Sequence, residues 1–117
     1  MTKKNKTSTR LLNFSVEITK FMRLLPNKPE YNVIKYQRIK SATSAGANYE
    51  EAQAGSSRAD FNNKVRISLR EMRESNYWLR IIKSVLITAN KKELDHLLKE
   101  SLELQNILGS ILVKTTR

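Results

Sequence analysis

Residues 57–88 read SRADFNNKVRISLREMRESNYWLRIIKSVLIT, a stretch of the chain that contains neither glycine nor proline. Its apolar residues recur at three- and four-residue steps, which is the spacing of one face of an α-helix. The predicted core face carries Phe61, Val65, Leu69, Met72, Leu79 and Leu86. Ser57 and Asp60 stand at the spacing of a capping box, which marks the start of a helix. The stretch therefore predicts one long helix over residues 57–88.

Three other segments show a similar pattern. In the first, apolar residues form a single stripe that ends before Pro26 and Pro29: Leu11, Phe14, Ile18, Phe21, Met22 and Leu25. The last begins with a capping signal at Asn90 and Glu93 and continues at helical spacing through Leu94, Leu97, Leu98, Leu102, Gln105, Leu108 and Leu112. We predict helices at about 8–25, 30–54, 57–88 and 90–114.

The second predicted helix carries a run of small residues between Ser41 and Ala47. Small side chains let two helix backbones approach each other closely. We therefore expect Ser41, Ala42, Ala45 and Asn48 to face a neighbouring helix.

Short links between these segments set the topology, because helices joined by a few residues must run antiparallel. The sequence predicts an all-α, single-domain, antiparallel up-down-up-down four-helix bundle over residues 8–117. Residues 1–7 are predicted to be a flexible basic N-terminal tail.

The charge of the chain is strongly positive, with a net charge of +11 and a pI of about 10.1. The excess lies in residues 1–40 and 58–83, whereas residues 91–117 are almost balanced. Such a chain is attracted to polyanions such as RNA, DNA or an acidic membrane surface. No apolar run approaches the roughly 20 residues that cross a bilayer. The absence of cysteine suits a reducing compartment, so we expect a cytoplasmic protein without a membrane partner.

Basic residues line one ridge of the third predicted helix. At 100° per residue, an arc of about 80° holds Arg66, Arg70, Arg73, Tyr77 and Arg80. An anionic partner would offset the repulsion within this row, and the aromatic ring could stack on an unpaired base. The plainer interpretation is a solvated face partly neutralised by Glu74. If the row binds nucleic acid, the N-terminal cations Lys3, Lys4, Lys6 and Arg10 would add phosphate contacts.

The same helix has a second apolar stripe, formed by Ile67, Trp78, Ile81 and Val85. A bundle core needs only one such face, so the second indicates burial against another subunit, where tryptophan is enriched. The alternative is that Trp78 covers the edge of the core as an amphipathic residue.

Catalytic motifs are absent from the sequence. His96 is the only histidine, and neither cysteine nor a second histidine stands at metal-ligand spacing. The carboxylate pairs Glu50–Glu51 and Glu71–Glu74 could perform acid–base chemistry, but charge balance is the simpler role in a basic chain. We expect a protein that is not an enzyme and that uses no metal and no cofactor.

Three runs carry a family resemblance: SATSAGANYEEA (41–52), SRADF (57–61) and REMRESNYWL (70–79). Together they resemble the bacterial four-helix-bundle proteins encoded in intervening sequences of the 23S rRNA gene. The match is detailed over the second and third predicted helices and covers the other two by pattern. Many members have an Arg-Ala pair where this chain has Lys40-Ser41, so a contact specific for a guanidinium is not expected there.

The resemblance implies a subunit of a homopentameric ring, with Asn48, Glu51 and the stripe that contains Trp78 at the subunit contacts. It leaves two functions open. One is binding of RNA, ribosomal RNA included, or of another polyanion. The other is a scaffold or accessory subunit that docks an acidic or nucleic-acid-handling protein such as a reverse transcriptase, as the related accessory subunit of diversity-generating retroelements does.

Overall fold

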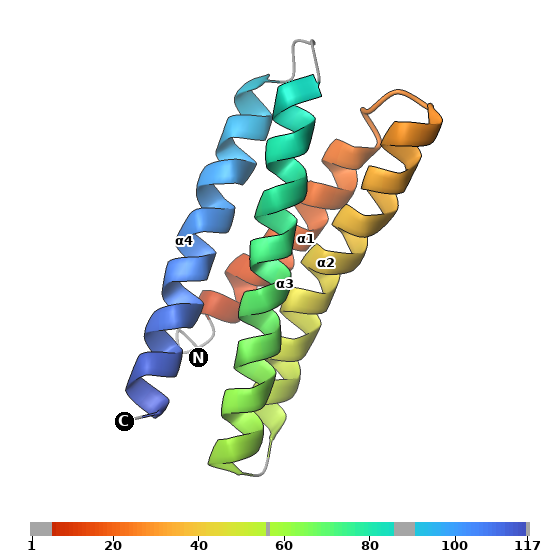
Figure 1. The fold of residues 1–117 in the computed structure, drawn as a ribbon. Helices are drawn as coiled ribbons and strands as arrows, with labels where there is room; N and C mark the ends of the chain where they lie inside the picture. The colour runs from red at the N-terminus through yellow and green to blue at the C-terminus, as the bar shows by residue number, and fades with distance from the viewer. Residues whose placement is uncertain (1–5, 56, 86–90, 117) are drawn as a thin grey trace.

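Four α-helices make up the part of the chain that the computed structural model describes, which is residues 6–55, 57–85 and 91–116. They are α1 (Lys6–Met22), α2 (Pro29–Ala54), α3 (Arg58–Val85) and α4 (Lys91–Thr115). Consecutive helices run in opposite directions and form one elongated bundle of 45 × 24 × 23 Å (Figure 1). The prediction of an all-α four-helix bundle is confirmed.

The helix ends follow local signals in the sequence. The Oγ of Ser57 accepts a hydrogen bond of 3.0 Å from the backbone N–H of Asp60, so the predicted cap of α3 is present. Helix α1 begins at Lys6, two residues before its predicted start, which places this lysine in the helix and not in a tail. It ends at Met22 and continues as a tight turn to Leu25. The predicted end of the third helix and Asn90 lie outside the described residues.

A close approach of backbones explains the small residues of α2. Ser41, Ala42 and Ala45 are buried, as predicted, whereas Asn48 is half-buried. The hydroxyl of Ser15 on α1 donates to the carbonyl of Ala42 at 3.1 Å, and the hydroxyl of Ser68 on α3 donates to the carbonyl of Ala45 at 2.7 Å. Both contacts require a neighbouring side chain to reach the α2 backbone, which larger residues at these positions would block.

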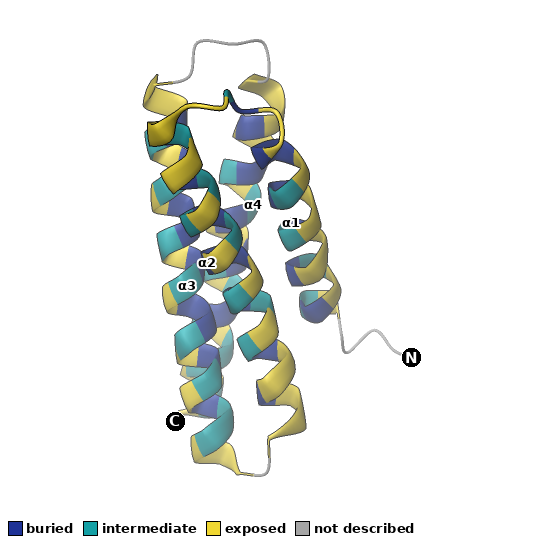
Figure 2. Cartoon of the chain, turned by 90° about the vertical axis from the view of Figure 1, so that its right-hand side faces the viewer, coloured by how far each residue is buried: buried dark blue, intermediate teal, exposed yellow. Residues whose placement is uncertain are grey.

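The core lies along the inner faces of the four helices (Figure 2). All six predicted core residues of α1 are buried, although Leu25 lies just beyond the helix end. Phe61 is half-buried against the core, and Leu86 lies outside the described residues. Leu102, a member of the apolar series of the fourth helix, is 53% exposed, and Ser101 takes the core position beside it. The serine hydroxyl accepts a 2.8 Å hydrogen bond from Asn76 of α3, which compensates for its burial.

Candidate nucleic-acid interface and neighbouring surfaces

The arginine row predicted on α3 lies on the outer surface of the bundle. Its four arginines are exposed, and Tyr77 is 52% exposed. Hydrogen bonds from Ser68 to α2 and from Asn76 to α4 fix the inward side of α3. At 100° per residue, the centre of the row lies about 160° from Ser68 and about 80° from Asn76, so the row lies on the outer side of α3, toward α4. The bundle therefore presents Arg66, Arg70, Arg73, Tyr77 and Arg80, hereafter the arginine row, to solvent.

Few partners within the chain neutralise the row. Among the described residues its one ion pair joins the Arg70 Nη2 to the Glu71 Oε2 at 3.8 Å, with Arg70 70% exposed. The Nε of Arg80 donates to the Oδ1 of Asn76 at 3.0 Å, and its guanidinium carbon lies 5.6 Å from the centre of the Tyr77 ring. Glu74, expected to balance the row, instead accepts a hydrogen bond from Trp78. The row thus keeps most of its charge.

The N-terminal cations are placed differently from the arginine row. Lys3 and Lys4 lie outside the described residues, and Lys6 is exposed at the first residue of α1. Arg10 is committed to α4: its Nε and Nη2 donate to the two carboxylate oxygens of Glu100 at 3.0 and 2.6 Å. Its Nη2 also donates to Glu103 at 2.8 Å. These hydrogen bonds raise the pKa of Arg10 above its usual value, so Arg10 could contact phosphate only by leaving this pair.

The second apolar stripe of α3 lies beside the arginine row, on the side of α3 that faces α2. Ile67, Trp78 and Ile81 are half-buried, and Val85 is 50% exposed. Trp78 and Ile81 pack against the core, and the Trp78 Nε1 donates to Glu74 at 3.3 Å. The tryptophan therefore covers the edge of the core as an amphipathic residue, which was the alternative to a subunit contact. The rest of the stripe still exposes apolar surface to solvent.

The two polar residues assigned to subunit contacts lie on α2. The side-chain amide of Asn48 donates to the carbonyl of Ser44 at 2.9 Å, within the same helix. Glu51 is exposed. Neither residue forms a described contact with the apolar stripe.

A groove between α1 and α2 was not expected from the sequence. It has a volume of about 340 Å³ and is lined by Ser8, Leu12, Ser15, Thr43, Gly46, Ala47 and Glu50. Leu12 and Val16 stand one helical turn apart beside it and are 62% and 43% exposed. The sequence does contain a signal for this surface. Leu12 and Val16 stand at positions i and i+4, on a face of α1 that is displaced from its core stripe.

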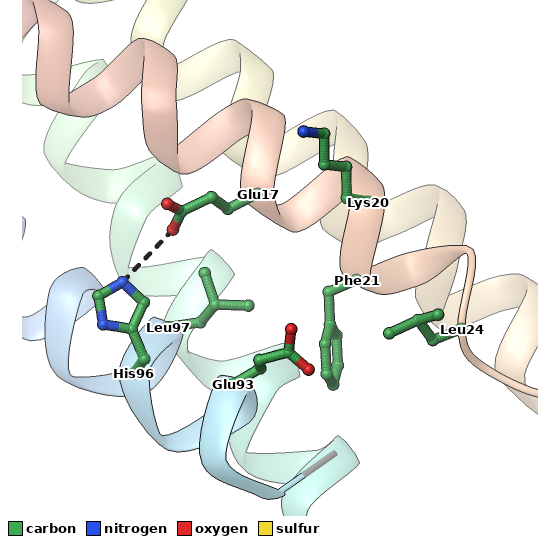
Figure 3. Close-up of a pocket in the computed structure, with 7 residues that line it drawn as sticks. All are labelled: Glu17, Lys20, Phe21, Leu24, Glu93, His96 and Leu97. Carbon is green, nitrogen blue, oxygen red and sulfur yellow. Dashed lines mark ion pairs between the residues drawn. The ribbon is translucent and has the colours of Figure 1, made fainter.

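A second cleft lies between α1 and α4 (Figure 3). Its volume is about 360 Å³, and Phe21, Leu24 and Leu97 form its apolar part. His96 lies at its rim, 63% exposed, with its Nε2 3.4 Å from a carboxylate oxygen of Glu17. The described residues contain no group of three or more acidic, histidine or cysteine side chains that could hold a metal ion.

The carboxylates considered for acid–base chemistry do not converge on one site. Glu50 accepts a hydrogen bond from Ser8 and lines the α1/α2 groove, whereas Glu51 is exposed. Glu71 and Glu74 contact Arg70 and Trp78 on the outer side of α3.

One charged residue of the core was missed entirely. Arg38 on α2 is fully buried, and its guanidinium carbon lies 6.0 Å from the centre of the Phe14 ring. Its Nη1 donates to the backbone carbonyl and the hydroxyl of Ser75 on α3. Ile34, Arg38 and Ala42 follow each other at four-residue steps, so the sequence did place position 38 on the inward face of α2.

These surfaces define the class of the protein: a small basic helical bundle whose accessible features suit binding. In the described residues no helix has the length and apolarity needed to span a membrane. A family model described as "23S rRNA-intervening sequence protein" matches residues 3–110, so the chain belongs to that family.

A solved structure supports the same assignment. The chain is similar to a protein of unknown function from the S23 ribosomal protein family of Bacteroides thetaiotaomicron, with 36% sequence identity and a TM-score of 0.80. The match covers 91% of this chain and 97% of that one. No curated protein matches the chain.

Proposed function

We propose that this chain is a non-catalytic, homo-oligomeric RNA-binding protein of the cytoplasm, in which the arginine row contacts phosphates. The observation that carries the proposal is the exposure of four aligned guanidinium groups with one long ion pair among them. Like charges at i and i+4 cost roughly 0.2–0.5 kcal/mol per pair in an isolated helix. A polyanion laid along α3 would turn that cost into attraction.

The dimensions of the row suit a nucleic acid strand. From Arg66 to Arg80 the helix rises about 21 Å, which is long enough to follow several consecutive phosphates. Tyr77 adds an exposed aromatic face within the row, and Arg80 already packs against that ring. A base could stack on the same aromatic platform, which favours a single-stranded or looped segment over a regular duplex.

RNA is preferred over DNA because of the family to which the chain belongs. The family description names a 23S rRNA intervening sequence, and the similar solved structure is assigned to the S23 ribosomal protein family. Recognition would rest on phosphate contacts, so base specificity should be modest and affinity should fall steeply with salt. Ribosomal RNA, or its transcript, is the first RNA to test.

The test compares two variants of equal charge. One replaces the four arginines of the row with glutamate, and the other replaces four exposed lysines of α4 with glutamate: Lys91, Lys92, Lys99 and Lys114. We expect the arginine variant to lose RNA binding and the lysine variant to weaken it much less. For single-stranded RNA, loss of four phosphate contacts should reduce the slope of log K against log salt by roughly 3.

Unchanged RNA binding in the arginine variant would refute the assignment. Equal losses in both variants would mean that binding depends on net charge and not on the row. Capture of one dominant protein after nuclease treatment would favour the accessory-subunit function instead.

Homo-oligomerisation forms the second half of the proposal. A closed ring needs two different contact surfaces on each subunit, because its interfaces are head-to-tail. The chain offers two apolar surfaces: the α3 stripe with Val85 and the α1/α2 groove with Leu12. We propose that these surfaces meet in a ring, with five copies as the family resemblance implies.

Sedimentation can test the ring directly. Leu12 and Val85 are exposed in the single chain, so Leu12→Glu and Val85→Glu should leave the bundle folded and lower the sedimenting mass. Leu24→Glu, at an equally exposed position outside both surfaces, serves as the control. A monomeric mass of the unaltered protein at micromolar concentration would contradict oligomerisation.

The proposal that the chain is not an enzyme is supported by the placement of its carboxylates. Glu50 accepts a hydrogen bond from Ser8 beside the α1/α2 groove, whereas Glu71 and Glu74 contact Arg70 and Trp78 on the outer side of α3. A general acid or base needs a neighbouring group that positions a substrate in the same pocket. Incubation of the purified protein with labelled RNA should leave that RNA intact, and specific cleavage or modification would refute this part.

A further inference from the structure

Arg38 carries a positive charge inside the bundle that no described residue balances. Its side chain is fully buried, and its Nε and Nη2 have no hydrogen-bond partner. These are the two buried side-chain nitrogen or oxygen atoms without a partner in the described part of the chain. Only Nη1 is used, through Ser75. Buried polar groups are normally paired, so two adjacent unpaired donors on one cation call for a ligand.

The unpaired atoms form one edge of the guanidinium group. Nε and Nη2 carry parallel N–H bonds, which is the fork that binds a carboxylate through two hydrogen bonds. The same chain shows this fork occupied elsewhere: Arg10 donates through Nε and Nη2 to both oxygens of Glu100. At Arg38 the equivalent edge has no such partner. Its geometry is therefore ready for a small anion that accepts two hydrogen bonds.

The positive charge of Arg38 favours an anion over a neutral ligand at this edge. Arg38 forms no ion pair with a described acidic residue, and its neighbours Phe14 and Ser75 carry no negative charge. Burial lowers the pKa of Arg38 to about 9, so the group remains charged at neutral pH. Water could satisfy the two donors, but it would leave the positive charge in a medium of low polarity. An anion satisfies both the donors and the charge.

We propose that the Nε–Nη2 edge of Arg38 binds a small monovalent anion, of the size of chloride or formate, inside the bundle beside Phe14 of α1 and Ser75 of α3. The site is separate from the arginine row and does not depend on RNA binding. Its ligand stabilises the folded chain because the unfolded chain has no such enclosed site.

The test measures thermal unfolding at constant pH and ionic strength while sodium gluconate is exchanged for sodium chloride or sodium formate. Gluconate and formate carry the same carboxylate, but gluconate is too large for an enclosed site. We expect the Tm to rise by about 5 °C for each tenfold increase in chloride or formate above the dissociation constant. The variant Arg38→Met should show no such rise.

Arg23→Met is the matched control, because it removes an exposed arginine outside the arginine row and should keep the full response. The same anion dependence in Arg38→Met as in the unaltered protein would overturn the proposal. Should Arg38→Met fail to fold, crystals of the unaltered protein grown in bromide decide the question. Anomalous density for bromide within hydrogen-bond distance of Nε and Nη2 supports the site, and water alone at that position overturns it.

Discussion

Replacing Arg38 with methionine should stabilise the protein, although it removes contacts from the centre of the bundle. Arg38 is fully buried with Nε and Nη2 unpaired, and burial lowers its pKa from the usual arginine value to about 9. A shift of that size corresponds to about 5 kcal/mol of unfavourable burial of the charged form. Methionine fills an apolar site of similar length without that cost.

The loss of two contacts offsets part of this gain. The hydrogen bonds from Nη1 to Ser75 contribute roughly 2 kcal/mol, because their donor is charged. The packing of the guanidinium near the Phe14 ring contributes about 1 kcal/mol. The expected net gain from Arg38→Met is about 2 kcal/mol, within the range of about 1–4 kcal/mol seen when apolar residues replace buried charges.

The pH dependence of this gain can be worked out from the lowered pKa. Above about pH 9 the folded state releases the Arg38 proton, while the unfolded state, in which the pKa of arginine is at its usual higher value, retains it. The contribution of Arg38 to stability therefore rises with pH above 9, and it is constant and unfavourable below about pH 8. The advantage of Arg38→Met should shrink by about 1 kcal/mol between pH 9 and pH 10, because Arg38 is only half deprotonated in the folded state at pH 9.

Urea unfolding followed by circular dichroism measures both effects, with sodium gluconate as the only salt. The unaltered protein and Arg38→Met are compared at pH 7 and pH 10, so that titration of the shared lysines and tyrosines cancels in the difference. Arg38→Leu checks that the gain does not depend on the flexibility of methionine. A loss of more than about 1 kcal/mol in both variants would refute the reasoning, because it would mean that Arg38 has a compensating partner.

Three smaller changes test the interior of α4, the start of α3 and the contact between α1 and α4. Gly109→Ala should stabilise α4 by about 0.5–1 kcal/mol, because a Cβ at this position meets no atom within 4 Å; urea unfolding measures it, and a loss of stability would contradict the open space. Ser57→Ala should cost about 1 kcal/mol through loss of the cap on α3, and the same assay with Ser57→Asp should recover most of it. Arg10→Ala should lower the free energy of unfolding by about 1 kcal/mol, because the bidentate pair of Arg10 with Glu100 is partly exposed. Amide hydrogen exchange should then become faster in α1 than in α3, and an equal increase in both helices would argue against a local role.

The fold could be predicted because its signals are local and repeated. Apolar spacing in α1 and α3 and the serine cap at residue 57 each act over a few residues, so they can be recognised without knowing the neighbours. The exposure of Leu102 shows the limit of this reasoning. Leu102 belongs to the apolar series of the fourth helix, whereas the phase of α4 places Ser101 in the core. The buried serine hydroxyl donates to the carbonyl of Leu98 on its own helix and accepts from the amide of Asn76, which is 25 residues away and cannot be inferred from α4 alone.

The candidate site was predictable in part for the same reason. The direction of the arginine row follows from the helix phase, and its four arginines are exposed as that phase requires. The role of Arg10 depends on Glu100, which lies 90 residues along the chain, and no local pattern connects them. Arg38 occupies a core position by phase, but the absence of a carboxylate beside it is a property of three helices packed together. Burial without a partner cannot be deduced from one helix.

The structure also limits how much of the net charge of +11 is available to a partner. Arg38 is enclosed, Arg10 is paired with Glu100 and Glu103, and the Lys83 Nζ lies 3.0 Å from Asp95. Counterion release depends on the phosphates that a protein contacts and not on its net charge. Four contacts from the arginine row predict a slope of log K against log salt of roughly −3 for single-stranded RNA, whereas a slope proportional to all eleven charges would be between two and three times steeper. A measured slope near the larger value would mean that a second basic surface, away from α3, shares the RNA.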